Sequence, residues 1–126
     1  MWFASQRGAT RLSAELHAMR AHFPGFRLFK LPGGRLAWRG WLRVRDGRGY
    51  QVSAELPERY PYAAPTLRVL SPALVGGCPH RYGDGSLCIH LNHWNPMTGT
   101  VVQSIANAAD WLRCYQHWRR TGVWPR

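Results

Sequence analysis

The sequence predicts an α+β domain made of an N-terminal helix, a four-stranded antiparallel meander, an irregular loop and a second helix that covers the sheet. Two observations predict this fold class. Apolar residues recur every three or four positions near both ends of the chain, as they do on amphipathic helices. Between these segments, short runs of strand-forming residues are separated by glycine-rich turns, as in consecutive hairpins.

The first helix is predicted over residues 9–22. Leu12, Leu16 and Met19 follow one another at helical spacing, with charged residues between them. The segment Phe23-Pro24-Gly25 then stops the pattern, because proline and glycine both disfavour a continuing helix.

Four strands are predicted after this helix, at residues 26–31, 36–45, 50–56 and 66–70. The turns at residues 32–34 and 46–49 contain the glycines that tight hairpins require. In the third strand apolar and polar residues alternate, which predicts one buried face. The prolines between the third and fourth strands predict an extended connection.

An irregular loop and a second amphipathic helix are predicted after the sheet. Residues 71–87 are too rich in glycine and proline for regular structure, and functional groups often lie in such loops. The helical pattern then runs from Val101 to Tyr115 and predicts a helix that packs on the sheet. We expect the Trp-containing segment that follows, residues 118–125, to pack on the body of the domain.

Length and composition favour one domain over residues 1–126. A chain of 126 residues suits a single core, and 45% hydrophobic residues indicate a globular protein. We expect a cytoplasmic protein without membrane contact, since the sequence shows no long apolar span and no secretory signal. Three cysteines, an odd number, favour free thiols over a disulfide framework.

The formal charge of +11 raises the possibility of a nucleic-acid-binding domain. The arginines are scattered along the chain, however, with no run of five. A basic, solvated surface is therefore the simpler explanation, and such a surface would also attract an acidic protein partner. The sequence thus makes nucleic acid an unfavoured partner.

One segment concentrates chemically reactive residues. Cys88 follows the turn Asp84-Gly85 and precedes a Trp-x-Pro sequence at residues 94–96. A Tyr-Pro-x-x-x-Pro sequence lies upstream at residues 60–65. The residues of this ordered pattern are Tyr60, Pro61, Pro65, Gly85, Cys88, Trp94 and Pro96.

In this order the residues resemble the ubiquitin-conjugating (E2) family, and the resemblance runs from about residue 56 to residue 111. The interval from Cys88 to Trp94 is shorter than is usual in the family, which is similar to compact bacterial E2-like proteins of antiviral-defence or ubiquitin-like conjugation operons. The resemblance implies an E2-like fold and an enzyme that needs no cofactor or metal. It also implies three partners: an E1-like activating enzyme, a ubiquitin-like protein and a target protein.

The resemblance further implies that Cys88 carries the ubiquitin-like protein as a thioester and passes it to an amine of the target. A thiol suits this because it is both a nucleophile and a leaving group. Where the family has a His-Pro-Asn tripeptide, this chain has Cys78-Pro79-His80. His80 is therefore the candidate for stabilising the oxyanion. His90 and His93 are candidates for the base that deprotonates the attacking amine, because histidine exchanges protons near neutral pH.

Two further functions remain open from the sequence. The repeated Cys-x-His pairs at residues 78–80 and 88–90 offer four ligands for zinc, although one intervening residue is a short spacing for a structural zinc pair. An E2-like adaptor without catalysis is the other alternative. For the enzyme, the resemblance places the docking site of the E1-like partner at the N-terminal helix, with Arg7 just before it and Arg11 and Arg20 within it.

Overall fold

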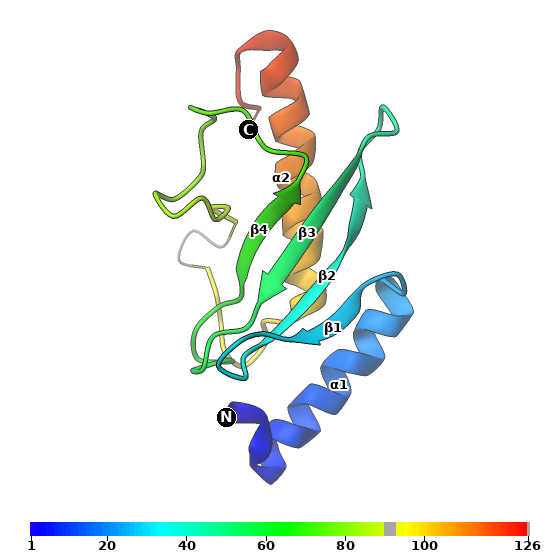
Figure 1. Cartoon of the computed structure of the whole chain (residues 1–126), viewed down its shortest axis with the longest axis vertical. Helices are drawn as coiled ribbons and strands as arrows, with labels where there is room; N and C mark the ends of the chain where they lie inside the picture. The colour runs from blue at the N-terminus through cyan, green and yellow to red at the C-terminus, as the bar shows by residue number, and fades with distance from the viewer. Residues whose placement is uncertain (90–92, 126) are drawn as a thin grey trace.

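The computed structural model describes residues 1–89 and 93–125 of the chain (Figure 1). Its elements, in chain order, are η1 (Trp2–Ala4), α1 (Gln6–His22), β1 (Arg27–Lys30), β2 (Leu36–Arg43), β3 (Gly49–Glu55), β4 (Thr66–Ser71) and α2 (Val101–Thr121).

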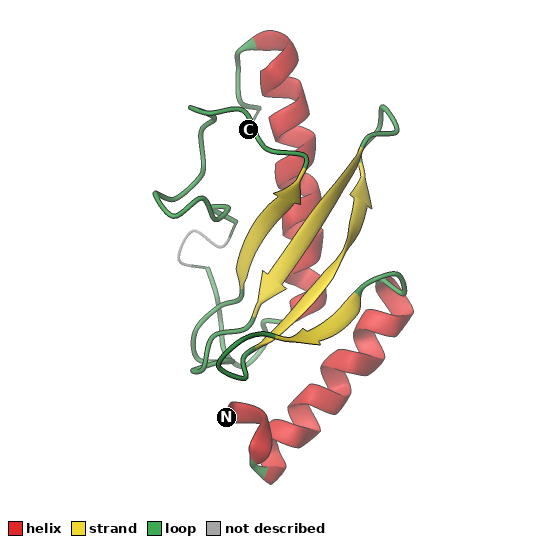
Figure 2. Ribbon diagram, viewed as in Figure 1, coloured by secondary structure: helices red, strands yellow, loops and turns green. Residues whose placement is uncertain are grey.

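The four strands form one antiparallel sheet in the order β1-β2-β3-β4, which is the predicted meander. Helix α2 crosses behind the sheet, and α1 lies beside the β1 edge and contacts α2 (Figure 2). The face of the sheet turned toward the viewer in Figure 1 has no helix in front of it. The predicted α+β class is confirmed.

The ends of the elements depend on local capping. Helix α1 begins three residues earlier than residue 9, because the side chain of Ser5 accepts a hydrogen bond from the Gly8 backbone N–H at 3.0 Å. Strand β2 ends at Arg43, two residues earlier than predicted, where a turn begins in which the Gly47 backbone N–H bonds to the Val44 carbonyl at 2.9 Å.

The core lies between the sheet and α2. Alternate residues of β3, Tyr50, Val52 and Ala54, are almost fully buried, as their alternation predicted. Ile105 and Leu112 of α2 are fully buried against them. Each large apolar side chain buried in this way stabilises the fold by about 1.5–3 kcal/mol.

A buried carboxylate joins α1 to the start of α2. Glu15 is 2% exposed and receives hydrogen bonds from the Arg11 Nε–H at 3.2 Å, from the Val101 backbone N–H at 3.1 Å and from the Tyr60 hydroxyl. The guanidinium of Arg11 also donates to the carbonyls of Pro96 and Gly99. This junction fixes the segment that follows the active-site loop.

The junction alters the pKa of Tyr60 and orients the charge of Arg11. Burial, together with the neighbouring Glu15 carboxylate, raises the pKa of Tyr60 well above its ordinary value. Arg11 is half-buried and its charge is directed into the junction, whereas Arg7 and Arg20 are exposed on α1. Of the three arginines predicted to dock a partner, Arg11 therefore has an evident structural role.

Candidate active site

The chain approaches Cys88 through a turn built by Asp84. Its carboxylate accepts hydrogen bonds from the Ser86 backbone N–H at 2.9 Å and from the Ser86 hydroxyl at 2.6 Å. These bonds lower the pKa of Asp84, since they stabilise the ionised carboxylate. Gly85 has φ of 88°, which a residue with a side chain rarely adopts. The sequence Asp84-Gly85-Ser86 thus fixes the direction of the following residues.

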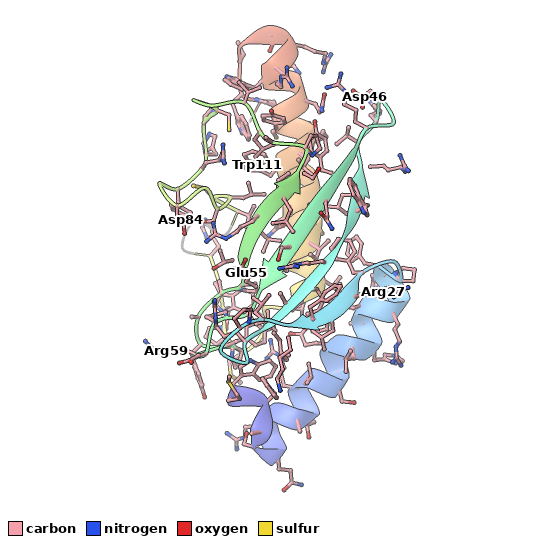
Figure 3. All side chains as sticks on the ribbon, viewed as in Figure 1. Arg27, Asp46, Glu55, Arg59, Asp84 and Trp111 are labelled. Carbon is pink, nitrogen blue, oxygen red and sulfur yellow. The ribbon has the colours of Figure 1, made fainter. Side chains whose placement is uncertain are left out.

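The loop is attached to β4 at two points. The Leu87 backbone N–H donates to the Leu67 carbonyl at 2.9 Å. Arg68 of β4 forms ion pairs with Asp84 at 3.2 Å and with Glu55 at 3.5 Å, and Figure 3 labels both of these acidic residues. The reactive segment is therefore positioned by the sheet edge and by its own turn.

The backbone of Cys88 is held by the carbonyl of His80. This oxygen accepts the Cys88 N–H at 3.0 Å and the indole N–H of Trp111 at 2.9 Å. Trp111 lies on α2 and is 4% exposed, so the helix that covers the sheet also fixes the active-site loop. The position of Cys88 is therefore set jointly by two segments of the loop and by α2.

The thiol of Cys88 faces a cleft of about 230 Å³ between the loop, α2 and the C-terminal segment. The described residues that line it are His80, Cys88, Ile89, Asn107, Asp110, Trp111, Arg113, Cys114, Trp124 and Pro125. The ring of Trp124 lies 4.9 Å from that of His80 and 5.2 Å from that of Trp111, measured between centroids. The C-terminal segment therefore packs on the body, as expected, and forms one wall of the cleft.

The electrostatic environment disfavours the thiolate of Cys88. Burial raises the pKa of this thiol, a hydrogen bond with Tyr82 lowers it, and the negative charge of Asp84 raises it, with a raised pKa as the net result. Proximity to Cys88 in turn raises the pKa of the Tyr82 hydroxyl. Only a small fraction of Cys88 is therefore thiolate at neutral pH.

The three predicted histidines differ in their relation to the cleft. His80 lines the cleft, and its ring is exposed and packs on Trp124. It also has φ of 61°, a left-handed conformation in which histidine is enriched among non-glycine residues. His93 is exposed and is not among the residues lining the cleft. His90 lies outside the described residues.

Sequence reasoning missed Tyr82, Trp111 and Trp124 as parts of this site. Tyr82 had a detectable signal, because the tight turn at residues 83–85 returns the chain and brings Tyr82 near the thiol. Trp111 lies within the helix predicted over residues 101–115, and that position alone indicates no functional role. Its indole N–H still needed an acceptor, and the His80 carbonyl supplies it.

The Tyr-Pro sequence at residues 60–61 packs against the Trp-x-Pro sequence that follows Cys88. The indole N–H of Trp94 donates to the Pro61 carbonyl at 2.7 Å, and its ring lies 5.9 Å from that of Tyr60. The Tyr-Pro and Trp-x-Pro sequences are thus in direct contact although more than 30 residues separate them. This contact joins the segment before β4 to the segment that follows Cys88 in the chain.

The structure offers no support for the zinc alternative among residues 1–89 and 93–125, where no group of three or more His, Cys, Asp or Glu side chains could hold a metal ion. Cys78 is buried, and its sulfur is 3.9 Å from a guanidinium nitrogen of Arg81. None of the helices within the described residues combines the length and the hydropathy that a transmembrane span requires.

Comparison with known proteins decides the family. The family model described as Type II CBASS E2 protein matches residues 15–126, which is most of the chain. The chain belongs to this family. The predicted E2-like identity, and its link to antiviral-defence systems, are confirmed.

Solved structures show the same fold as this Type II CBASS E2 protein. A structure titled as a complex of the Vps23 UEV with ubiquitin has a TM-score of 0.61 at 17% identity, covering 85% of this chain and 83% of that one. Human ubiquitin-conjugating enzyme E2 G1 has a TM-score of 0.60 at 19% identity, covering 84% of this chain and 94% of that one. At such low identity these similarities establish the fold alone.

A curated relative matches a shorter part of the Type II CBASS E2 protein. Ubiquitin-conjugating enzyme 15 of Arabidopsis thaliana is 39% identical over 49 residues, which are 37% of this chain and 29% of that enzyme. The match thus spans less than a third of the relative. Family and fold together support an E2-like conjugating role in general terms.

Proposed function

We propose that this protein accepts a ubiquitin-like protein from an E1-like enzyme as a thioester on Cys88 and transfers it to an amine of a target protein. The observation that carries the proposal is the exposure of the cysteines. Cys88 and Cys114 both line the cleft, but Cys78 and Cys114 are only 9% and 7% exposed, whereas Cys88 is half-buried. Of the three thiols, Cys88 is the one that a large acyl donor reaches most readily.

The proposed reaction has two acyl transfers. In the first, the thiolate form of Cys88 attacks the carbonyl carbon of the thioester on the E1-like enzyme, the carbon–sulfur bond to that enzyme breaks, and the cysteine of that enzyme leaves as a thiolate. In the second, the target amine attacks the new thioester, the carbon–sulfur bond to Cys88 breaks, an amide forms, and a base takes the proton of the amine. The first transfer exchanges one thioester for another, so a strongly activated thiolate is not required. The raised pKa of Cys88 is compatible with this exchange.

The histidines have separate roles in the proposal. His80 stabilises the oxyanion of the second step, since it lines the cleft next to the thiol. His90 and His93 are the candidates for the base. A positioned donor or base of this kind accelerates such a step by about 10² to 10⁴.

Partner binding completes the proposal. Arg7 and Arg20 are exposed on α1 and provide a basic surface for an E1-like enzyme. We place the reaction in the cytoplasm, where reducing conditions keep the free cysteines as thiols.

Intact mass after incubation with ATP and the cognate E1-like and ubiquitin-like proteins tests the first transfer. The wild type is expected to gain one modifier in a bond that dithiothreitol cleaves. Cys88→Ser is expected to gain no thiol-sensitive adduct, while Cys114→Ser, a control in the same cleft, behaves as the wild type. Noncovalent binding of the modifier by wild type and Cys88→Ser alike, without any adduct, would instead indicate an adaptor.

Single-turnover discharge to a free amine tests the roles of the histidines. His80→Ala is expected to slow discharge by about 10² or more while loading stays unchanged. His80→Asn is expected to restore part of the rate, because an amide N–H can also donate to the oxyanion. Equal rates for His80→Ala and the wild type would remove His80 from the mechanism, and His90→Ala and His93→Ala distinguish the candidate bases in the same assay.

A further inference from the structure

Basic residues that are far apart in the sequence lie close together on the uncovered face of the sheet. The strand register pairs Arg27 of β1 with Arg39 of β2, Arg39 with Ser53 of β3, and Ser53 with Arg68 of β4. Residues paired in this way project from the same face of a sheet. A row of three arginines and one serine therefore crosses all four strands, whose order can be followed in Figure 1.

Two exposed aromatic side chains lie on this face on either side of the row. Phe29 pairs with Ala37, two residues before Arg39, and Trp41 lies two residues after it, so all three share the outer face. Phe29 is 43% exposed and Trp41 is 58% exposed. Two residues of a strand advance by about 7 Å, which is the separation expected between successive positions on this face.

The central arginine packs against an aromatic ring and forms no ion pair among residues 1–89 and 93–125, although Glu55 lies diagonally from it on the same face. The Arg39 guanidinium lies 5.5 Å from the centroid of the Phe29 ring. Its Nε–H and the Ser53 hydroxyl are buried without a hydrogen-bond partner among the described residues. In native proteins such unsatisfied groups are rare. Because these two atoms are buried, an incoming ligand meets the exposed rings and charges of this face rather than the Nε–H itself.

Positive charge exceeds negative charge over this face. Arg68 is neutralised by Glu55 and Asp84. Arg27 and Arg39 form no ion pair within residues 1–89 and 93–125. Arg43, which follows Trp41 on the same face of β2, uses one nitrogen to bond the Gly47 carbonyl and has no acidic partner within that part of the chain either. The face is thus suited to an anionic ligand.

We propose that this face, defined by Arg27, Phe29, Arg39, Trp41 and Arg43, binds single-stranded nucleic acid. Aromatic rings on an open sheet stack with unpaired bases, and flanking arginines contact the phosphates. A surface of acidic side chains would pair with the arginines alone, whereas a nucleic acid pairs with the arginines through its phosphates and with Phe29 and Trp41 through its bases. The alternation of ring and cation along the sheet therefore favours nucleic acid.

This site is separate from the thioester chemistry. None of its five residues lines the cleft at Cys88. Variants of the face are therefore expected to load a modifier as the wild type does, and failure of either proposal leaves the other standing. The sequence did not show the site because its arginines become neighbours only through the antiparallel register.

Fluorescence anisotropy with a labelled 15-nucleotide oligothymidine at about 150 mM salt tests the proposal. Trp41→Ala is expected to raise Kd by about fivefold or more, the loss typical of one stacked base, while Trp41→Phe stays near the wild type. Arg27→Gln/Arg43→Gln is expected to weaken binding and to reduce the slope of log K against log salt by about 1.4, corresponding to about 0.7 for each lost phosphate contact.

A charge-matched control decides whether the site is local. Arg119→Gln/Arg120→Gln removes the same charge from exposed positions in the last turn of α2. It is expected to leave Kd within about twofold of the wild type, and circular dichroism verifies that each variant is folded. Equal weakening by both double variants would overturn the proposal, because binding would then follow net charge alone.

Two further outcomes would also overturn it. The first is absence of binding by the wild type at about 150 mM salt. The second is displacement of the oligonucleotide by polyglutamate as effectively as by unlabelled oligothymidine, together with an unaltered Kd for Trp41→Ala. That pattern would assign the face to an acidic protein.

Discussion

Replacement of Glu15 by alanine tests whether the buried junction between α1 and α2 holds the fold together. The carboxylate is 2% exposed and receives three hydrogen bonds, from Arg11, Val101 and Tyr60. Removal of the carboxylate leaves the buried Val101 N–H and the buried Tyr60 hydroxyl without the oxygen atoms that accept their hydrogen bonds. Each such loss costs about 1–3 kcal/mol.

The charge on Arg11 adds to this cost. Its side chain is 23% exposed, so solvent compensates part of the lost ion pair. We therefore expect Glu15→Ala to lower the free energy of unfolding by about 3–5 kcal/mol, the range for breaking one side of a buried pair. Glu15→Gln keeps an oxygen for the Val101 N–H and is expected to cost about 1–2 kcal/mol.

Urea unfolding at pH 7 measures both variants. The midpoint is expected to fall while the m-value stays unchanged, since the same surface is exposed on unfolding. Glu58→Ala, at an exposed position, is the matched control and is expected to change stability by less than about 0.5 kcal/mol. A loss below about 1 kcal/mol for Glu15→Ala would refute the reasoning.

Three other predictions concern the site and its support. Asp84→Asn is expected to lower the pKa of Cys88 and to speed its alkylation by iodoacetamide at pH 7, because a negative charge is removed. Tyr82→Phe is expected to raise the pKa of Cys88 and to slow its alkylation, because a hydrogen bond to the thiolate is lost. Rate changes in the same direction for both variants would contradict these opposite effects of Asp84 and Tyr82 on the thiol. Trp124→Ala removes a wall of the cleft and is expected to speed modification of Cys88 by a bulky maleimide more than by iodoacetamide, whereas an unchanged ratio would show that Trp124 does not limit access. Gly99→Ala would place a methyl carbon 2.5 Å from the indole of Trp94, so thermal unfolding is expected to show that the free energy of unfolding falls by about 1–3 kcal/mol. A melting temperature equal to that of the wild type would show that the loop accommodates the methyl group without cost.

The sheet could be predicted from sequence because its signals are local. The alternation of Tyr50, Val52 and Ala54 reports one buried face, and the glycines at residues 33–34 and 47 mark the hairpins. Element ends were less accurate, because the start of α1 depends on the side chain of Ser5.

The candidate site was predicted only where a motif names its residues. Cys88 and His80 follow from the ordered pattern, and both line the cleft. Trp124 lies 36 positions beyond Cys88 in the chain, and its contact with His80 depends on the path of the chain after α2. Such a contact has no local signal.

Arg11 shows a different limit of sequence reasoning. A charged residue on an amphipathic helix is normally assigned to the solvent face. Here the equally charged Glu15, one turn away, is buried and directs Arg11 toward the loop before α2. The spacing of the pair was visible in the sequence, but its burial depends on Tyr60 and Val101, which come from distant segments.

Peptide mapping of the loaded protein identifies which cysteine carries the modifier. A short trypsin digest without reductant places the three cysteines on separate peptides, residues 69–81, 82–113 and 114–119. We expect the C-terminal fragment of the modifier to be attached to the 82–113 peptide alone, at Cys88, and to be released by dithiothreitol. Attachment to either of the other two peptides, or a loaded protein with no thiol-sensitive adduct, would contradict the proposed role of Cys88.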